Sequence, residues 1–418
     1  MKICVVGLGY IGLPTAAMLA SRGHEVVGYD VSDRVVAAVN AGEAHFQEPD
    51  LQMLLSAAVG TGRLRADTAP EGADYFIIAV PTPIQPGGAP DMSYVDKAAA
   101  AIAPVLTPGA TVILESTSPV GSTETMAAAI AAARPDLRVP RYKDEGGAAD
   151  IAVCHCPERI LPGRMMTELI ANDRIIGGLS WACADKALEL YKTFVMGACY
   201  VTDSRTAELV KLSENAFRDV NIAFANELSM ICERLEVDVW AVRELANRHP
   251  RVDILTPGAG VGGHCIAVDP WFIVHSAPED ARLIRTARDV NDDKPRRICA
   301  RVRRLADRFK APTVACYGIT YKPDVDDVRE SPALDIVRDL AGDGGRLLVV
   351  EPNLSELPPS LKRDNVALVD AGQAQREADI AVFLVGHRAF KRMEADAFLG
   401  KAVVDGIGLL SRPTIRIV

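Results

Sequence analysis

The sequence predicts an α/β protein with two doubly wound parallel-sheet domains joined by a central long-helix unit. Three observations lead to this prediction. Short apolar, β-branched runs alternate with helix-like segments over the first 180 residues, and the same alternation restarts after about residue 310. Between them lies a long run without glycine or proline. We therefore expect domains at residues 1–190, 191–305 and 306–418.

The first domain is predicted from five short runs, each of the length of one strand. They are apolar throughout, as strands buried on both faces of a parallel sheet must be. Helix-like segments separate them, which is typical of a sheet with helices on both faces. The expected strands are residues 3–7, 25–30, 75–80, 111–116 and 150–155.

The central unit is predicted from residues 206–235, which should form one long helix, with more helix following to Asn247. Such a helix can join two domains or form the seam of a dimer; a plain structural spine is the alternative. The second α/β domain should contain strands at residues 313–318, 346–352, 379–386 and 402–408.

Composition narrows the possible functions. The 418 residues carry a net charge of −9, which argues against binding to nucleic acid or to a membrane surface. No signal peptide and no apolar run of about 20 residues is present, so we expect a cytoplasmic protein. The nine scattered cysteines fit reduced thiols. No metal site is expected, because Cys154, His155 and Cys156 would alternate between two faces of a strand.

A glycine-rich loop follows the first predicted strand. Gly7, Gly9 and Gly12 form the pattern GxGxxG, with Tyr10 and Ile11 between them, at the start of a helix. In a Rossmann-like domain the first glycine permits a tight turn, the second lets the backbone approach a pyrophosphate, and the third allows close helix–strand packing. A dinucleotide is therefore the expected cofactor.

The residues that follow the other strands indicate which dinucleotide. Asp30 ends the second strand, where a carboxylate accepts hydrogen bonds from ribose hydroxyls. Arg34 could hold a 2′-phosphate, but Asp30 would repel that group, so we expect NAD. Thr82 and Thr117 follow two further strands and are candidates for hydrogen bonds to the cofactor. Turn and helix-cap chemistry is the alternative for both threonines.

The long helix carries a row of polar side chains. Lys211 and Asn215 are four residues apart and share a face, and Arg218 lies seven residues from Lys211 on the same face. Donors on a rigid helix could stabilise a developing alkoxide at a site that binds NAD. A solvated polar stripe is the alternative interpretation.

A second glycine-rich stretch, GAGVGGHCIAVDPWF at 258–272, surrounds Cys265. A thiolate there can attack an aldehyde and form a thiohemiacetal, which can lose a second hydride to become a thioester. Asp269 lies close enough in sequence to activate the water that releases a carboxylate. We expect the glycines to leave room for a substrate. A buried cysteine in a packing loop is the alternative.

Seven motifs in order resemble the UDP-glucose/GDP-mannose 6-dehydrogenase family over essentially the whole chain. They are GLGYIGLP, AVPTP, ESTSPVGST, CPERILPG, KLSENAFRD, GVGGHCIAVDPWF and YKPDVDDVRESPA. Three stretches, NRHPRVDILTPG, GGHCIAVDPWFIV and RLIRTARDVND, look most like its UDP-N-acetyl-D-mannosamine dehydrogenases. The UDP-N-acetylglucosamine 6-dehydrogenases share a GGHC-type loop, so that sugar remains the alternative.

The resemblance implies an NAD-dependent, four-electron oxidation of a UDP-sugar at C6 to a carboxylate, for surface polysaccharide biosynthesis. It implies Cys265 as the nucleophile and Lys211 as the acid/base or oxyanion partner. Asn215 would assist the oxyanion and Asp269 would position water. Secondary catalytic or water-binding groups would be Glu158 and Thr117.

The resemblance also implies binding residues and a partner. An arginine of the NRHPR stretch, Arg251, would reach the partner subunit's site, which implies a homodimer. Arg329 would contact the cofactor near the dimer interface. The implied substrate contacts are Arg159, Ile160, Lys211, Asn215, Arg218, His249, Arg251, Gly262, Tyr321 and Lys322.

Two departures from the family pattern concern ligand binding. Ala259 stands where a proline is expected, which should loosen the loop slightly. Ile407 stands where relatives often carry a lysine that contributes to ligand binding, so affinity or specificity should differ.

Two rival functions remain. A two-electron dehydrogenase of the β-hydroxyacid type would share the topology and the helix Lys/Asn pair, but would need no cysteine. A non-catalytic NAD-binding regulator would not need Lys211, Asn215, Cys265 and Asp269 together.

Overall fold

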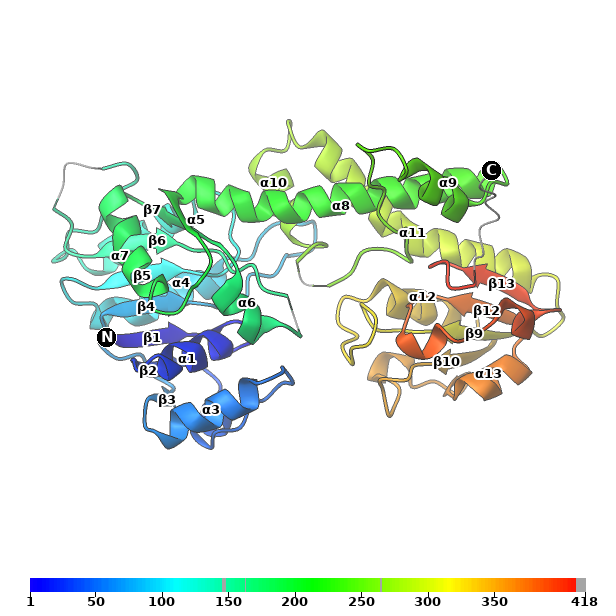
Figure 1. The fold of residues 1–418 in the computed structure, drawn as a ribbon, viewed down its shortest axis with the longest axis horizontal. Coiled ribbons are helices and arrows are strands. Elements are labelled where there is room, and N and C mark those ends of the chain that lie inside the picture. Colours follow the sequence, from blue (N-terminus) through cyan, green and yellow to red (C-terminus); the bar gives the residue numbers. More distant parts are fainter. Residues whose placement is uncertain (145–147, 162, 264, 411–418) are drawn as a thin grey trace. The chain divides into compact units, whose positions relative to one another are not determined.

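The computed structural model describes residues 1–144, 148–161, 163–263 and 265–410. They divide into two compact units, one made by Met1–Glu214 and the other beginning at Asn215. Each unit contains a largely parallel sheet with helices packed on it, which confirms the predicted fold class (Figure 1). Within the described ranges, no helix has both the length and the apolar character needed to cross a membrane.

The sheet of the first unit has the strand order β3-β2-β1-β4-β5-β6-β7-β8. All neighbouring strands run parallel except β6 and β7, an antiparallel pair that the sequence did not reveal. The order reverses between β1 and β4, and ligands bind at the carboxyl edge of such a switch point. The strands are β1 (Lys2–Val6), β2 (Glu25–Tyr29), β3 (Leu64–Asp67), β4 (Tyr75–Ile78), β5 (Thr111–Leu114), β6 (Ala152–His155), β7 (Arg174–Gly178) and β8 (Cys199–Asp203).

The central strands of this sheet are buried on both faces, so Val5, Phe76 and Ile113 are all fully covered. Local capping fixes where two of the helices begin. Ser32 accepts a hydrogen bond from the Val35 amide at the start of α2, and Ser180 caps α7 in the same way. The helices are α1 (Gly12–Ser21), α2 (Asp33–Asn40), α3 (Leu51–Gly60), α4 (Ser93–Ile102), α5 (Ser122–Ala133), α6 (Met165–Ala171) and α7 (Trp181–Tyr191).

The predicted long helix is α8 (Ser204–Arg234), which begins in the first unit and ends in the second. In the second unit a buried ion pair joins it to α11, with Arg288 Nη1 lying 2.6 Å from Asp219 Oδ1. The expected continuation to Asn247 is a separate helix, because Asp238 caps a new N-terminus there. The further helices are α9 (Val239–Ala246), α10 (Asp269–Ser276) and α11 (Arg282–Ala306).

The second sheet is parallel throughout, with the order β11-β10-β9-β12-β13. Its order reverses between β9 and β12, which creates a second switch point at the carboxyl edge. The strands are β9 (Thr313–Tyr317), β10 (Arg346–Val350), β11 (Val366–Leu368), β12 (Ile380–Phe383) and β13 (Ala402–Asp405), and helices α12 (Pro332–Ala341) and α13 (Ala371–Glu377) pack on them.

Candidate active site

The glycine-rich loop of the first unit combines packing constraints with one open position. Gly7 has a φ of +91°, and a Cβ there would lie 2.6 Å from the Ala79 carbonyl oxygen. A Cβ at Gly12 would lie 1.8 Å from the Gly7 oxygen, so only glycine fits either place. At Gly9, by contrast, a Cβ would meet no protein atom within 4 Å. The bare backbone at Gly9 is therefore accessible to a ligand, as a pyrophosphate requires.

Asp30 is fixed beside this loop at the end of β2. Its two carboxylate oxygens accept backbone hydrogen bonds from Leu8 and Ser32, each at 2.9 Å. Each oxygen can accept a further hydrogen bond, which is what two ribose hydroxyls would need. Arg34 is exposed, and Tyr10 packs its ring against Phe46. These residues fit the adenosine half of NAD.

Thr82 and Thr117 follow β4 and β5, and both are partly exposed. The neighbouring Ser116, which the sequence did not single out, joins the ends of these two strands. Its hydroxyl accepts from the Val80 amide at 2.9 Å and donates to the Val80 carbonyl at 2.7 Å. Ser116 thereby fixes the edge that carries both threonines.

Glu158 lies after β6 in a buried ion pair. One carboxylate oxygen accepts from the Arg159 amide at 2.6 Å, and the other accepts from Arg174 at 2.5 Å. Arg174 is only 1% exposed. Glu115 lies in the same cluster, with Tyr191 donating to it at 3.3 Å. Burial and then the charge of Glu158 raise the pKa of Glu115 to about 8, although Arg174 opposes both effects.

We expect Glu115→Gln to become more stabilising as pH rises. The folded-state pKa of Glu115 lies near 8, above its ordinary value of 4.5. The stability that its protonation contributes is complete below the ordinary value and is lost as pH rises through the folded value. The melting temperature of the variant minus that of the native chain should therefore increase between about pH 5 and about pH 9. The exposed Glu189→Gln serves as the control, and a gap that stays constant with pH would contradict the prediction.

Three further residues that the sequence predicted to take part in binding or catalysis belong to the first unit. Arg159 forms an ion pair with Glu214 at 2.6 Å, and Ile160 packs at the edge of the core. Lys211 is partly buried on α8. It lies one helical turn before Asn215, as the sequence spacing requires.

In the second unit, Asn215 and Asp269 lie in contact although 54 residues separate them. The Asn215 amide donates to Asp269 Oδ2 at 2.6 Å. Asp269 is buried at the first position of α10, and its backbone amide donates to the Cys265 carbonyl at 2.8 Å. Asp269 therefore connects α8 to the loop that carries the cysteine.

The nine cysteines differ sharply in exposure. Cys265 is exposed, Cys199 is partly buried and the other seven are buried. Burial raises the pKa of Cys4, Cys156 and Cys299 to about 12, so these thiols stay protonated at neutral pH. A bulky substrate can reach the sulfur of Cys265 far more readily than that of any buried thiol.

Two of the glycines near Cys265 do not serve the purpose that we expected. A Cβ at Gly262 would lie 2.2 Å from the Glu330 carbonyl oxygen, and one at Gly260 would lie 2.8 Å from Pro332. The loop is also held by Asn226, a buried residue missed in the sequence, which accepts from the Gly258 amide at 2.9 Å. At Gly260 and Gly262 the missing side chain lets the loop pack on the chain itself, rather than leaving room for a substrate.

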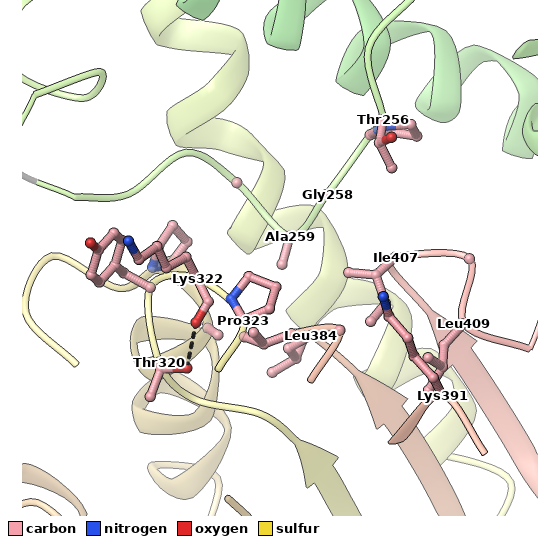
Figure 2. A pocket seen from close by; sticks show the side chains of 18 residues that line it. Thr256, Gly258, Ala259, Thr320, Lys322, Pro323, Leu384, Lys391, Ile407 and Leu409 are labelled. Carbon is pink, nitrogen blue, oxygen red and sulfur yellow. Dashed lines mark hydrogen bonds between the residues drawn. The ribbon is translucent and has the colours of Figure 1, made fainter. Parts of the chain in front are cut away.

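A cavity of about 760 Å³ lies beside the start of this loop, within the second unit (Figure 2). Lys322 lies on one side of Ala259, and Ile407 and Lys391 lie on the other. Tyr321 also lines the cavity. Lys391 was missed in the sequence because nothing in its surroundings marks it. The walls are residues 256–260, 320–323, 332–333, 384–386, 391 and 407–409.

The remaining predicted binding residues are exposed and do not line this cavity. Arg218 projects from α8, and His249 accepts a hydrogen bond from the Arg251 amide at 3.3 Å. Arg329 forms a two-pronged ion pair with Asp327, the shorter contact being 2.7 Å. In the described part of the chain, no three His, Cys, Asp or Glu side chains are grouped to hold a metal ion.

Comparison with known domains accounts for nearly the whole chain. Residues 1–195 match the NAD binding domain of the UDP-glucose/GDP-mannose dehydrogenase family, 205–293 its central domain and 315–412 its UDP binding domain. The chain belongs to this family. The dehydrogenase therefore uses NAD as its cofactor, as the glycine loop and Asp30 predicted, and it carries a UDP-sugar binding domain.

Individual relatives are similar over almost their full lengths. A Ralstonia nicotianae protein named NDP-N-acetyl-D-galactosaminuronic acid dehydrogenase is 55% identical over 99% of this chain and 97% of its own. The Escherichia coli UDP-N-acetyl-D-mannosamine dehydrogenase is 53% identical over 97% of this chain and 98% of its own. A Pyrococcus horikoshii UDP-D-ManNAc dehydrogenase structure has a TM-score of 0.87 at 37% identity, over 99% of this chain and 97% of that one.

Proposed function

We propose that this dehydrogenase oxidises UDP-N-acetyl-D-mannosamine at C6 to UDP-N-acetyl-D-mannosaminuronate, for surface polysaccharide biosynthesis. The observation that carries the proposal is the exposed thiol of Cys265, on a loop whose Asp269 contacts Asn215. A two-electron alcohol dehydrogenase has no use for a nucleophilic thiol at this place. A four-electron enzyme needs one to hold the aldehyde carbon.

The proposed chemistry has two oxidations and one hydrolysis. NAD, when bound, accepts a hydride in each oxidation. Between the two oxidations the Cys265 thiolate adds to the aldehyde carbon and forms a C–S bond. The resulting thiohemiacetal is oxidised to a thioester. Water then breaks the C–S bond, releasing the carboxylate and the thiol. The sum is one alcohol, two NAD and one water giving one carboxylate, two NADH and three protons.

The side chains have separate roles in this scheme. The neutral amine of Lys211 accepts the alcohol proton and later passes it to solvent, and the ammonium that forms in between stabilises negative charge on the C6 oxygen. The amide of Asn215 has two N–H donors, of which one is bound to Asp269 and the other supports the same oxygen. Asp269 orients the water for hydrolysis, and Glu158 and Thr117 assist that step.

The ligands are assigned to residues in the same way. NAD is held by Gly7, Gly9, Tyr10, Ile11, Gly12, Asp30, Arg34, Thr82, Thr117 and Arg329. We place the uridine diphosphate in the 760 Å³ cavity, where Tyr321 and Lys322 line one wall. The sugar is held by Arg159, Ile160, Arg218, His249, Arg251 and Gly262.

A second sugar is favoured by one observation. The Ralstonia nicotianae relative, named for N-acetyl-D-galactosaminuronic acid, is as similar to this chain as the mannosamine dehydrogenases are. UDP-N-acetyl-D-galactosamine is therefore the second candidate, and UDP-N-acetyl-D-glucosamine the third. All three share the chemistry at C6 and differ from one another only in ring configuration.

The function is tested by counting NADH per sugar consumed. The purified chain is incubated with NAD and, separately, with the UDP-N-acetyl derivatives of mannosamine, galactosamine and glucosamine, and with UDP-glucose. Two NADH with the mannosamine substrate alone are expected. Two NADH with another sugar would keep the mechanism and change the substrate. One NADH per sugar would refute the four-electron mechanism.

We further propose that the chain acts as a homodimer formed through α8. Phe217, Phe224 and Ile231 are spaced seven residues apart and are 70%, 58% and 46% exposed. Residues at this spacing form one stripe along a helix, and large exposed apolar stripes mark interfaces. Arg251 would then complete the partner subunit's site.

Replacing Phe224 with glutamate should give a monomer. A charge in the middle of the apolar stripe would have to be buried without a partner when two copies associate. Light scattering after gel filtration should show half the native mass, with loss of most activity. Leu399→Glu, at another exposed apolar residue of the same unit, is the control. A Phe224→Glu variant of native mass would contradict the assignment of this interface.

A further inference from the structure

A buried ionisable pair, Glu351 and His387, makes hydrogen bonds to the backbone of the loop that carries Tyr321 and Lys322. Glu351 follows β10 and is 4% exposed, and His387 follows β12 and is fully buried. His387 Nε2 lies 3.0 Å from Glu351 Oε2. Neither residue lines the cavity, and neither is used in the proposed chemistry.

Glu351 holds the near end of the supporting loop. Its Oε2 accepts from the Ile319 amide at 2.8 Å and from the Thr320 amide at 3.3 Å. Burial alone would raise the pKa of Glu351, but the hydrogen bonds from His387 and Ile319 outweigh it and lower that pKa. The carboxylate is therefore charged at neutral pH and accepts these amides as charge-assisted hydrogen bonds.

His387 holds the far end of the same loop. Its Nδ1 lies 3.0 Å from the Asp324 amide nitrogen. A backbone N–H can only donate, so Nδ1 must accept and carries no proton. The proton of the neutral ring is then on Nε2, from which it is donated to Glu351. The two side chains are thus bonded to each other and accept hydrogen bonds from both ends of the loop, at Ile319–Thr320 and at Asp324.

The three residues between these anchor points, Tyr321, Lys322 and Pro323, all line the cavity. Tyr321 and Lys322 lie on its wall, and Thr320 closes the turn by donating to the Lys322 carbonyl at 3.0 Å (Figure 2). A loop fixed before binding loses less conformational entropy when a ligand orders it. The contribution of Glu351 and His387 should therefore be to binding and not to the chemical step.

We propose that Glu351 and His387 are positioning residues that preorganise the 319–324 loop for the uridine diphosphate. The inference rests on the proposed placement of that group in the cavity. It assigns a function to two residues that touch no substrate atom and lie 36 positions apart in the sequence.

The test uses the full chain with UDP as the probe and isothermal titration calorimetry as the readout. His387→Ala removes the ring nitrogen that accepts from the Asp324 amide and one of the donors to Glu351, and the Kd for UDP should rise about tenfold. His387→Asn should recover part of the loss, because its carbonyl oxygen can accept from Asp324. Glu351→Gln keeps the shape of the side chain and should also weaken binding, which gives a second variant should His387→Ala not fold.

Kinetics should show the same division. The KM for the UDP-sugar should rise with the Kd for UDP in these variants, whereas the KM for NAD and kcat at saturation should stay within about twofold. Asn365→Ala is the matched control. Its amide holds Ala341 and Gly345 at 3.0 and 2.9 Å in the same unit but away from the loop, so it should lower the melting temperature and leave UDP binding unchanged.

Two results would overturn the inference in different ways. If His387→Ala and Glu351→Gln lower the melting temperature and bind UDP like the native chain, the pair is merely structural. Lys322→Ala, on the cavity wall, tests the placement of the nucleotide itself. If that variant also binds UDP normally, the placement fails and the inference fails with it; if it binds weakly, only the inference about Glu351 and His387 fails.

Discussion

Replacing Cys265 with alanine is expected to lower the rate of NADH formation by about 10³-fold or more. Without the thiol no C–S bond can form, so the aldehyde carbon is not held for the second oxidation. Cys265→Ser keeps a hydroxyl, which is a much poorer nucleophile at neutral pH, and should stall after the first steps or turn over very slowly. The measurement is NADH formed per UDP-sugar consumed, in the steady state and in a single turnover.

The partly buried Cys199 supplies the control for this prediction. Cys199→Ser changes the most accessible of the other eight thiols and should retain native activity. Both Cys265 variants should bind UDP and NAD like the native chain, because the thiol is not needed for either. Full turnover by Cys265→Ala would refute the four-electron mechanism and favour the β-hydroxyacid type of dehydrogenase.

The second large effect is expected for Lys211→Ala, with kcat falling roughly 100-fold or more. In the proposed mechanism the ammonium group stabilises charge on the C6 oxygen, and this charge is larger in the transition state than in the bound alcohol. Its loss should therefore lower kcat and kcat/KM together and change the KM for the sugar little.

Two comparison variants make this prediction specific. Lys211→Arg keeps the positive charge and should recover part of the rate, but a guanidinium cannot exchange a proton near neutral pH. Lys186→Ala removes an exposed lysine paired with Glu189 and should be silent. A Lys211→Ala enzyme with the native kcat would remove this residue from the mechanism.

The fold could be predicted because its signals are local. Buried strands such as 75–78 and 111–114 are continuous apolar runs, and the helix over 204–234 contains no residue that would break it. The edge of the first sheet was less predictable. In β7, Arg174 and two glycines interrupt the apolar pattern, and β8 is only partly buried, so neither has the composition of a parallel core strand.

The residues of the candidate site likewise divide into those that the sequence could predict and those that it could not. The glycine loop, Asp30 and Cys265 follow from short spacings within single motifs. The pair of Glu158 and Arg174 and the pair of Glu351 and His387 join separate elements, and only the folded sheet brings their ends together. Sequence patterns show which face of one element is buried, but they do not show which polar groups meet across two elements. For this reason the prediction that Gly260 and Gly262 leave room for a substrate was wrong. The atoms that a Cβ would meet first at these two positions belong to residues 330–332.

The uneven exposure of the cysteines has a practical consequence. Because one thiol is exposed while seven are buried, a maleimide dye or iodoacetamide should modify the native chain first at Cys265. Activity should then fall in step with the first equivalent of label, and peroxide should inactivate the enzyme at the same atom. In the proposed mechanism the sulfur that forms the thioester is thus also the atom at which the enzyme is most easily inactivated, so reductant should be present throughout its purification.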